Sequence, residues 1–290
     1  MNKKNAHKKS QIALAATIML LITAADASAQ TATVYGLIDV AVERINNVAG
    51  VGSITRMPGA TASMPSYWGV RGSDDLGDGL KATYVLEGGF APDTGALGQA
   101  GRLFGRQAYV GLSGSWGAIT MGRQYSNLYW ALTDSNVIGP MSMGIGALDA
   151  YIPNARVDNA IAYRGNFDGL ALGGTFSLGR DSANPTPNNA AGTNCGGESA
   201  SDRKACRAVS LMAKYDRPTW GAAAAMDRMN GGSGSWAAAG LTSSSLSDQR
   251  VLVNGYYKFD ALKVAGGWMR RNNEGSVSTP RSDLYYFGIS

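Results

Sequence analysis

Few residue types in this sequence could carry out chemistry. The single histidine, His7, lies in the first 29 residues, which have a basic start, an apolar run over 12–23 and the small residues Ala27-Ser28-Ala29 before Gln30. That pattern is typical of a cleaved secretory signal. The mature domain that we predict, 30–290, therefore has no histidine for a Ser/His or Cys/His catalytic pair or for a zinc site. We predict no enzyme, no cofactor and no metal site.

The two cysteines, Cys195 and Cys206, lie in a polar stretch with ten residues between them. An even number of cysteines in an exported protein favours a disulfide, here one that pins a loop. The spacing fits no compact metal-binding motif. We therefore predict a Cys195–Cys206 disulfide.

The charge of the chain gives no reason to expect nucleic-acid binding. The sequence has 26 Lys and Arg against 21 Asp and Glu, and the predicted signal contains four Lys and one Asp of these. The mature domain is then left with 22 basic and 20 acidic residues, a net charge near +2. The acidic turn at 74–78 could bind calcium, but Asp and Gly more commonly serve the geometry of a short turn.

The elements that would position any charged site are strands. The segment 106–124 has apolar residues at every second position, then a short turn at 113–116, then a second alternating run. A period of two predicts two antiparallel strands, each with one apolar face. We count about twelve such strands. They include 33–45, 66–71, 80–90, 107–112, 117–124, 160–164, 170–178, 209–215, 220–226, 251–259, 262–268 and a last one from Asp283.

Connections between these strands alternate in length. Those at 72–79 and 113–116 are short, whereas those at 91–105 and 125–158 are long. Charged Lys81 and Glu87 share the face opposite the apolar one, which implies that this face is wet. Both features are typical of a transmembrane antiparallel β-barrel. After the predicted signal, no run of ~18 apolar residues could form a membrane-spanning helix.

A soluble β-sandwich is the alternative to a barrel, because alternation alone does not separate the two. Aromatic residues such as Trp68, Trp220 and Trp268 fall near predicted strand ends, as in the interfacial girdles of membrane barrels. The barrel is therefore favoured. An outer-membrane or secreted adhesin or binding module without channel activity remains the alternative function.

Several segments carry a family resemblance. They are VYGLIDVAVE, WGVRGSDDLGDGLKATYVLEGGF, FGRQAYVGLSGSWGAITMGRQYSNLY and RVDNAIAYRGNFDGLALGGTFS. They resemble the general trimeric porins of Gram-negative outer membranes, of the type found in Neisseria and Burkholderia. The resemblance covers most of 31–290 and implies a water-filled channel for ions and small hydrophilic solutes, in contact with outer-membrane lipid and assembled as a homotrimer. It also implies sixteen strands and a C-terminal aromatic residue, so we expect about four C-terminal strands to be missing from this sequence.

The resemblance further implies that the third loop, 125–157, folds into the lumen, where its acidic residues face basic residues of the wall. Opposed charges across a narrow wet pore create a transverse field that acts on dipolar solutes and ions. The candidate constriction residues are Arg123, Arg164, Arg156, Asp149, Asp134, Arg71, Lys81 and Tyr67.

Four positions along these strands carry a further expectation. Arg123 shares parity with apolar residues, so a bulge or a strand end would be needed to turn it inward. Arg106 also has lipid-side parity, and we expect it to snorkel at a rim or subunit contact. Neutral Tyr67 stands where porins of this family commonly carry arginine, and neutral Gln107 stands where some of them do, which weakens any claim of strong anion selectivity.

Overall fold

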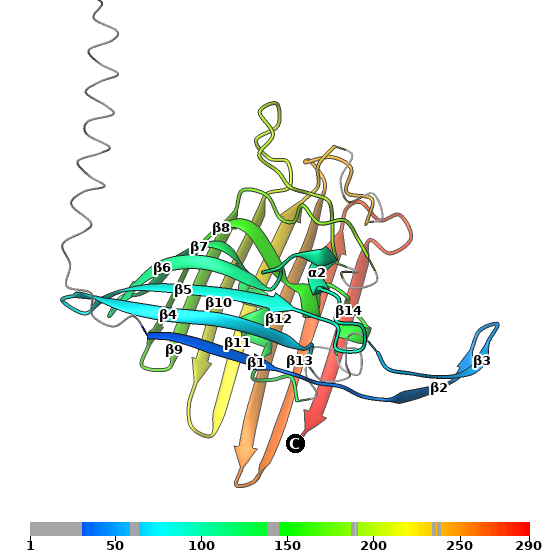
Figure 1. Ribbon diagram of the computed structural model, residues 1–290, viewed down its shortest axis with the longest axis horizontal. Coiled ribbons are helices and arrows are strands. Elements are labelled where there is room, and N and C mark those ends of the chain that lie inside the picture. The colour runs from blue at the N-terminus through cyan, green and yellow to red at the C-terminus, as the bar shows by residue number, and fades with distance from the viewer. Residues whose placement is uncertain are drawn as a thin grey trace, which may run out of the picture. The chain divides into compact units, whose positions relative to one another are not determined.

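The alternating runs form strands that lie side by side in one large sheet (Figure 1). The computed structural model describes residues 31–58, 64–137, 145–186, 189, 191–233, 236 and 239–290, and the predicted signal lies outside them. Twelve strands pair in chain order, which confirms the predicted number. They are β1 (Thr31–Leu37), β4 (Tyr67–Gly77), β5 (Leu80–Gly89), β6 (Gln107–Gly114), β7 (Gly117–Tyr125), β8 (Arg156–Phe167), β9 (Leu170–Ser177), β10 (Ala208–Asp216), β11 (Trp220–Asn230), β12 (Ser247–Phe259), β13 (Leu262–Asn273) and β14 (Arg281–Ile289).

From β4 to β14, every neighbouring pair is antiparallel. β1 and β14 are the two end strands of the sheet, and the described residues form no pairing between them. No helix in the described part of the chain is long and apolar enough to cross a membrane.

Tight turns and long connections alternate along the sheet, as predicted. At one end, pairs such as Gly114 with Gly117 and Phe259 with Leu262 close two-residue turns. At the other end, the connections are long and contain the remaining short elements. These are α2 (Gly98–Gly101), α3 (Asn127–Leu132) and the 3-10 turns η1 (Ile145–Ala147) and η2 (Ile152–Asn154).

The first predicted strand, 33–45, is divided in the structure. β1 ends at Leu37, and β2 (Glu43–Val48) pairs with β3 (Gly52–Arg56) in a separate hairpin that the sequence pattern did not predict. Between them, the Asp39 backbone N–H donates to Ser66 Oγ (2.9 Å) and the Asp39 carboxylate accepts the Met64 backbone N–H (3.2 Å). These hydrogen bonds hold Asp39 to the segment before β4. The strand therefore ends at Leu37, although the alternation of apolar and polar residues continues in the sequence.

The turn expected at 72–79 is shorter, because β4 extends to Gly77. Gly77 pairs with Leu80, and the two central residues Asp78 and Gly79 have φ of 51° and 76°. Positive φ at both positions is what a type I′ hairpin turn requires. The Asp75 carboxylate accepts the Gly77 backbone N–H (2.9 Å), so this acidic residue serves the turn. β12 and β14 likewise begin earlier than predicted.

The two faces of the sheet differ in kind. Large apolar side chains such as Val110 and Leu211 are about half exposed (59% and 50%), although they belong to strands in the middle of the sheet. The alternate positions, such as Ala160 and Ala162, are buried. We call the exposed apolar face the outer face and the other the inner face. A continuous exposed apolar face suits contact with lipid, so the all-β transmembrane class is confirmed.

Candidate functional site

The third loop lies on the inner face, as expected for a loop folded into the lumen. It leaves β7 after Tyr125 and enters β8 at Arg156. Its apolar side chains Leu128, Leu132 and Ile152 pack in one cluster with inner-face residues of β10 to β13. The strand residues of this cluster are Met212, Ala223, Ala225, Leu252 and Met269. Residues 138–144 of the loop lie outside the described residues.

Polar contacts fix the start of the loop. The Asn127 backbone N–H donates to Ser210 Oγ (2.7 Å), and its side-chain Nδ2 donates to Thr175 Oγ1 (3.1 Å). Gly173 of β9 permits this approach, because a Cβ there would collide with the Asn127 carboxamide. The N-terminus of α3 is therefore held against β9 and β10 by position-specific contacts.

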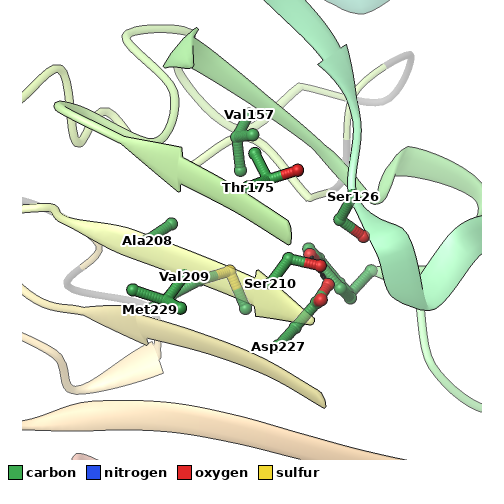
Figure 2. Close-up of a pocket in the computed structure, with 9 residues that line it drawn as sticks. Ser126, Val157, Thr175, Ala208, Val209, Ser210, Asp227 and Met229 are labelled. Carbon is green, nitrogen blue, oxygen red and sulfur yellow. Dashed lines mark hydrogen bonds between the residues drawn. The ribbon is translucent and has the colours of Figure 1, made fainter. Parts of the chain in front are cut away.

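A buried carboxylate lies under the loop. Figure 2 shows Ser126 of the loop near Ser210 of β10 and Asp227 of β11. The Tyr151 hydroxyl, also from the loop, donates to Asp227 Oδ2 (2.5 Å). The space between these residues is too small for a water molecule. This cluster therefore anchors the loop and is not a ligand site.

The acidic loop residues predicted to face the arginines have other ion-pair partners. Asp149 accepts Arg250 Nε (2.7 Å) and Nη2 (3.1 Å) from β12. Asp134 pairs with Lys214 of β10. Burial alone would raise the pKa of Asp149, but the Arg250 guanidinium holds it below its usual value.

Lys214 and Arg250 were missed by the sequence interpretation. Lys214 lies two residues from buried Met212, and Arg250 lies two residues from buried Leu252. The alternation of each strand could therefore have placed both basic residues on the inner face. Their pairing with the loop depends on its path in space, which alternation does not contain. In the described structure, Asp134 and Asp149 bind the loop to β10 and β12 and make no ion pair with Arg123 or Arg164.

Two predicted arginines on the opposite part of the inner face have no carboxylate partner among the described residues. Arg164 Nη2 donates to Gln124 Oε1 (3.2 Å), and its guanidinium lies 5.1 Å from the Trp130 ring of α3. Arg71 is exposed, and its guanidinium lies 4.9 Å from the Tyr35 ring. Neither guanidinium forms an ion pair with an acid that the structure describes.

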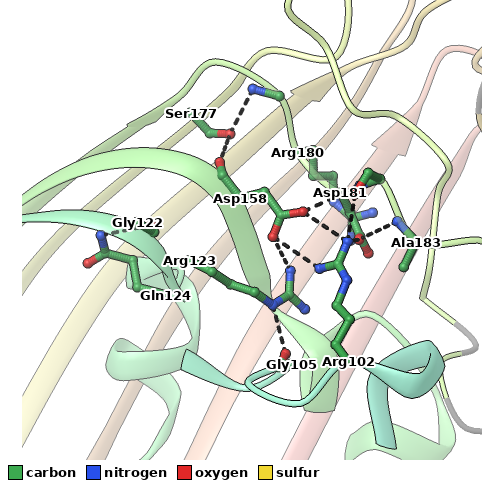
Figure 3. Close-up of polar contacts among 12 residues, drawn as sticks. Arg102, Gly105, Gly122, Arg123, Gln124, Asp158, Ser177, Arg180, Asp181 and Ala183 are labelled. Atoms are coloured by element: carbon green, nitrogen blue, oxygen red, sulfur yellow. Dashed lines mark hydrogen bonds and ion pairs between the residues drawn. The ribbon is translucent and has the colours of Figure 1, made fainter. Parts of the chain in front are cut away.

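A β-bulge turns Arg123 away from the outer face. The pairing of β7 with β8 shifts between Gly122 and Gln124, and Arg123 is largely buried. Its Nε donates to the Gly105 carbonyl (2.7 Å), and its Nη1 pairs with Asp158. Arg102 binds the same carboxylate through both Nη atoms (3.1 and 3.0 Å) (Figure 3). The bulge that the sequence required is therefore present, and Arg123 is neutralised.

Arg106 was expected at a rim, and the structure corrects this. It is buried, its Nε pairs with Glu87 (2.6 Å), and its guanidinium lies 4.3 Å from the Tyr67 ring. The strand β6 begins only at Gln107, so strand parity does not extend to Arg106. Tyr67 thus contacts an arginine, although it is itself neutral.

Arg156 is fully enclosed at the start of β8. It donates to the Tyr125 hydroxyl and to the Pro153 carbonyl (3.3 Å), and its guanidinium lies 4.1 Å from the Tyr125 ring. Tyr129 of α3 stacks on Tyr125, with ring centroids 3.9 Å apart. Arg156 therefore supports the loop from the wall, with no acid in an ion pair to it among the described residues.

The last candidate, Lys81, is exposed beside the β4–β5 turn. Of five arginines around the loop, two are in ion pairs in the described structure, Arg106 with Glu87 and Arg123 with Asp158, so positive charge is in excess on this part of the wall. The five are Arg71, Arg106, Arg123, Arg156 and Arg164. A charged inner face of this kind can attract anions and exclude cations.

The predicted disulfide is present. Cys195 and Cys206 are bonded, with a Cα–Cα distance of 5.3 Å. The Arg180 backbone N–H donates to the Cys206 carbonyl (2.9 Å), and the Asp181 N–H donates to the Cys195 carbonyl (3.1 Å). The disulfide and these hydrogen bonds therefore hold the connection between β9 and β10 close to the ends of the two strands.

Comparison with known proteins agrees with this architecture. An outer membrane porin protein of Bordetella pertussis is 32% identical over 209 residues, which are 71% of this chain and 51% of that protein. Outer membrane porin protein 32 of Delftia acidovorans is 34% identical over 178 residues, 57% of this chain and 48% of that protein. The chain thus spans about half the length of the curated relatives it matches.

Among solved structures, the anion-selective porin from Comamonas acidovorans is similar in fold. Its TM-score is 0.64 at 22% identity, over 90% of this chain and 74% of that one. A sequence model of the Gram-negative porin family matches residues 13–290. Since that match covers nearly the whole sequence, the chain belongs to the Gram-negative porin family and is an outer-membrane protein.

Proposed function

We propose that this protein forms a water-filled channel through which ions and small hydrophilic solutes diffuse passively across the outer membrane. The observation that carries the proposal is the contrast between the two faces of one sheet. The outer face exposes apolar side chains, while the inner face holds charged side chains and a folded loop. In a membrane barrel this arrangement puts lipid outside and water inside.

We also propose that Arg71, Arg164 and Tyr67 border the narrow part of the channel, where α3 lies near Arg164. In this proposal, Arg123 and Arg156 lie behind the channel lining and support these residues through hydrogen bonds and ion pairs. Asp134 and Asp149 set the position of the loop. Lys81 lies nearer the short-turn end. The two unpaired guanidiniums favour anions, and neutral Tyr67 and Gln107 keep that preference modest.

The proposed assembly is a homotrimer, in line with the family resemblance. Chemical cross-linking of the protein in intact outer membranes is the direct test. A ladder that ends at three copies supports the proposal, and a protein that stays uncrosslinked at every reagent concentration contradicts it.

Planar-bilayer recording tests the channel itself. The full chain, extracted from outer membranes in mild detergent, should produce stepwise increases in conductance. Across a KCl gradient, the reversal potential should have the sign of a chloride preference. Folded protein that inserts in lipid and leaves the bilayer electrically silent would contradict the channel and would favour a binding module.

A further inference from the structure

A groove lies on the outer face of the sheet, where β10 and β11 meet the long connections. Phe176, Val209 and Arg228 form its floor, from three neighbouring strands in direct register. Lys204 and Arg207 border it from the connection that contains the disulfide, and Ser244 and Ser245 border it from the connection after β11. The groove has a volume of about 640 Å³.

The groove lies at one boundary of the apolar band. On the outer face of β11, Trp220 and then alanines and Met226 precede Arg228. Eight residues at ~3.3 Å each span ~26 Å along a strand, or about 20 Å across a membrane at the usual tilt, close to the height of the apolar band. Trp220 follows a short turn, so Arg228 is at the long-connection end. Because long connections of such barrels face the exterior, the groove meets the outer leaflet.

The charge of the groove is strongly positive. Lys204, Arg207 and Arg228 make no ion pair among the residues that the structure describes. Arg207 Nη1 has no hydrogen-bond partner there either, and the guanidinium lies 5.5 Å from the Phe176 ring. The nearby acid, Asp202, accepts the Lys204 backbone N–H (3.0 Å). Hydrogen bonds from Ser244 and from that N–H lower the pKa of Asp202, so one negative charge stands against three positive ones.

We propose that this groove binds the phosphorylated head group of a glycolipid in the outer leaflet. Arginine and lysine are the side chains that recognise phosphate, and Ser245 adds a hydroxyl group. The apolar floor of Phe176 and Val209 suits an acyl chain and has no use in binding free phosphate. The inference rests on the outer-membrane location and is independent of whether the channel conducts.

Binding of purified diphosphorylated lipid A to the full chain in detergent micelles tests the proposal. Simultaneous Lys204→Glu, Arg207→Glu and Arg228→Glu should weaken the affinity at least about tenfold. Arg203→Glu, with the same charge change in the same connection but outside the groove lining, should stay within about threefold of the original affinity. Equal loss in both variants, or no loss in the triple variant, overturns the proposal.

Two further arms identify the ligand. Dephosphorylated lipid A should bind at least about tenfold more weakly than the diphosphorylated form, and inorganic phosphate at equal concentration should not displace lipid A. Displacement by inorganic phosphate would assign the site to a free anion and overturn the lipid assignment. Heat-modifiable electrophoretic migration checks that each variant is folded. The single exposed change Arg228→Gln, which leaves the loops intact, should still lower the affinity measurably.

Discussion

At the scale of single residues, the arginines of the inner wall fall into two kinds. Arg106 and Arg123 are ion-paired with Glu87 and Asp158, while Arg71 and Arg164 have no carboxylate partner in the described structure. A paired charge adds little to the field in the channel, whereas an unpaired charge beside water acts on passing ions. The two kinds should therefore respond differently to substitution.

Arg164→Gln should reduce the preference for anions. The substitution removes an unpaired positive charge on the inner face and keeps a hydrogen-bond donor for Gln124. We expect the chloride-to-potassium permeability ratio to fall roughly two- to threefold, measured as the reversal potential in planar bilayers. Arg217→Gln, in the exposed turn after β10, is the control and should leave the ratio unchanged. An unaltered ratio in both variants would show that Arg164 does not border the ion path.

Arg106→Gln should act mainly on stability. It leaves the buried Glu87 carboxylate without its guanidinium partner, and breaking one side of a buried pair costs about 3–5 kcal/mol. Denaturant unfolding followed by tryptophan fluorescence in detergent measures the loss. Adding Glu87→Gln to the same chain should restore part of it, because both charges are then gone. A double variant less stable than the single one would contradict this reading.

At the scale of elements, the third loop is held to the sheet by charge, hydrogen bonds and apolar packing together. Asp149, predicted to line the constriction, pairs with Arg250 of β12. Asp227 of β11 accepts the Tyr151 hydroxyl, and Asn254 Nδ2 donates to the Ala131 carbonyl of α3 (2.9 Å). These contacts hold the loop against the inner face, so their loss should loosen the loop without dismantling the sheet.

The Asp149 contact should depend on pH. Its pKa is lowered in the folded protein, so the stability that it contributes is fully present above the ordinary Asp pKa of about 3.9 and is lost as pH falls through the lowered value. Asp149→Asn should therefore unfold at a lower temperature than the original chain at pH 7, and the two should converge under strong acid. Asp168→Asn, at an exposed turn, should match the original chain throughout. A difference for Asp149→Asn that persists unchanged in acid would refute the ionic contribution.

The disulfide should stabilise the connection between β9 and β10. Replacing both cysteines by serine removes the cross-link that restricts the unfolded chain. The resulting gain in entropy of the unfolded chain should lower the free energy of unfolding by about 3 kcal/mol. Thermal unfolding of the Cys195→Ser, Cys206→Ser chain measures the effect. Reductant should lower the unfolding temperature of the original chain and leave that of the variant unchanged; an equal response in both would mean that reductant acts elsewhere.

Sequence alternation predicted what depends on neighbours along one strand. It placed Arg164 on the inner face and showed that Arg123 needed a bulge, because parity holds wherever the strand is regular. It failed at Arg106, which precedes the first paired residue of β6, and at Asp39, whose tertiary hydrogen bonds end β1. The partners of Asp134 and Asp149 depend on the path of a long loop across four strands, which no local pattern contains.

At the scale of the whole molecule, one sheet separates two environments. The apolar outer positions and the charged inner positions alternate along the same strands, so a shift of one residue would exchange every side chain between them. The proposed channel, its proposed anion preference and the proposed glycolipid groove all depend on which face meets lipid and which meets water.

Thiol accessibility in lipid vesicles tests this assignment most directly, because the two native cysteines are held in the disulfide. Single cysteines replace Arg71, Lys81 and Ser113 on the inner face, and Val110 and Leu112 on the outer face. We expect a charged, water-soluble thiol reagent to label the inner set rapidly and leave the outer set unreacted until detergent dissolves the vesicles. Equal labelling of both sets in intact vesicles, or faster labelling of the outer set, would contradict the account.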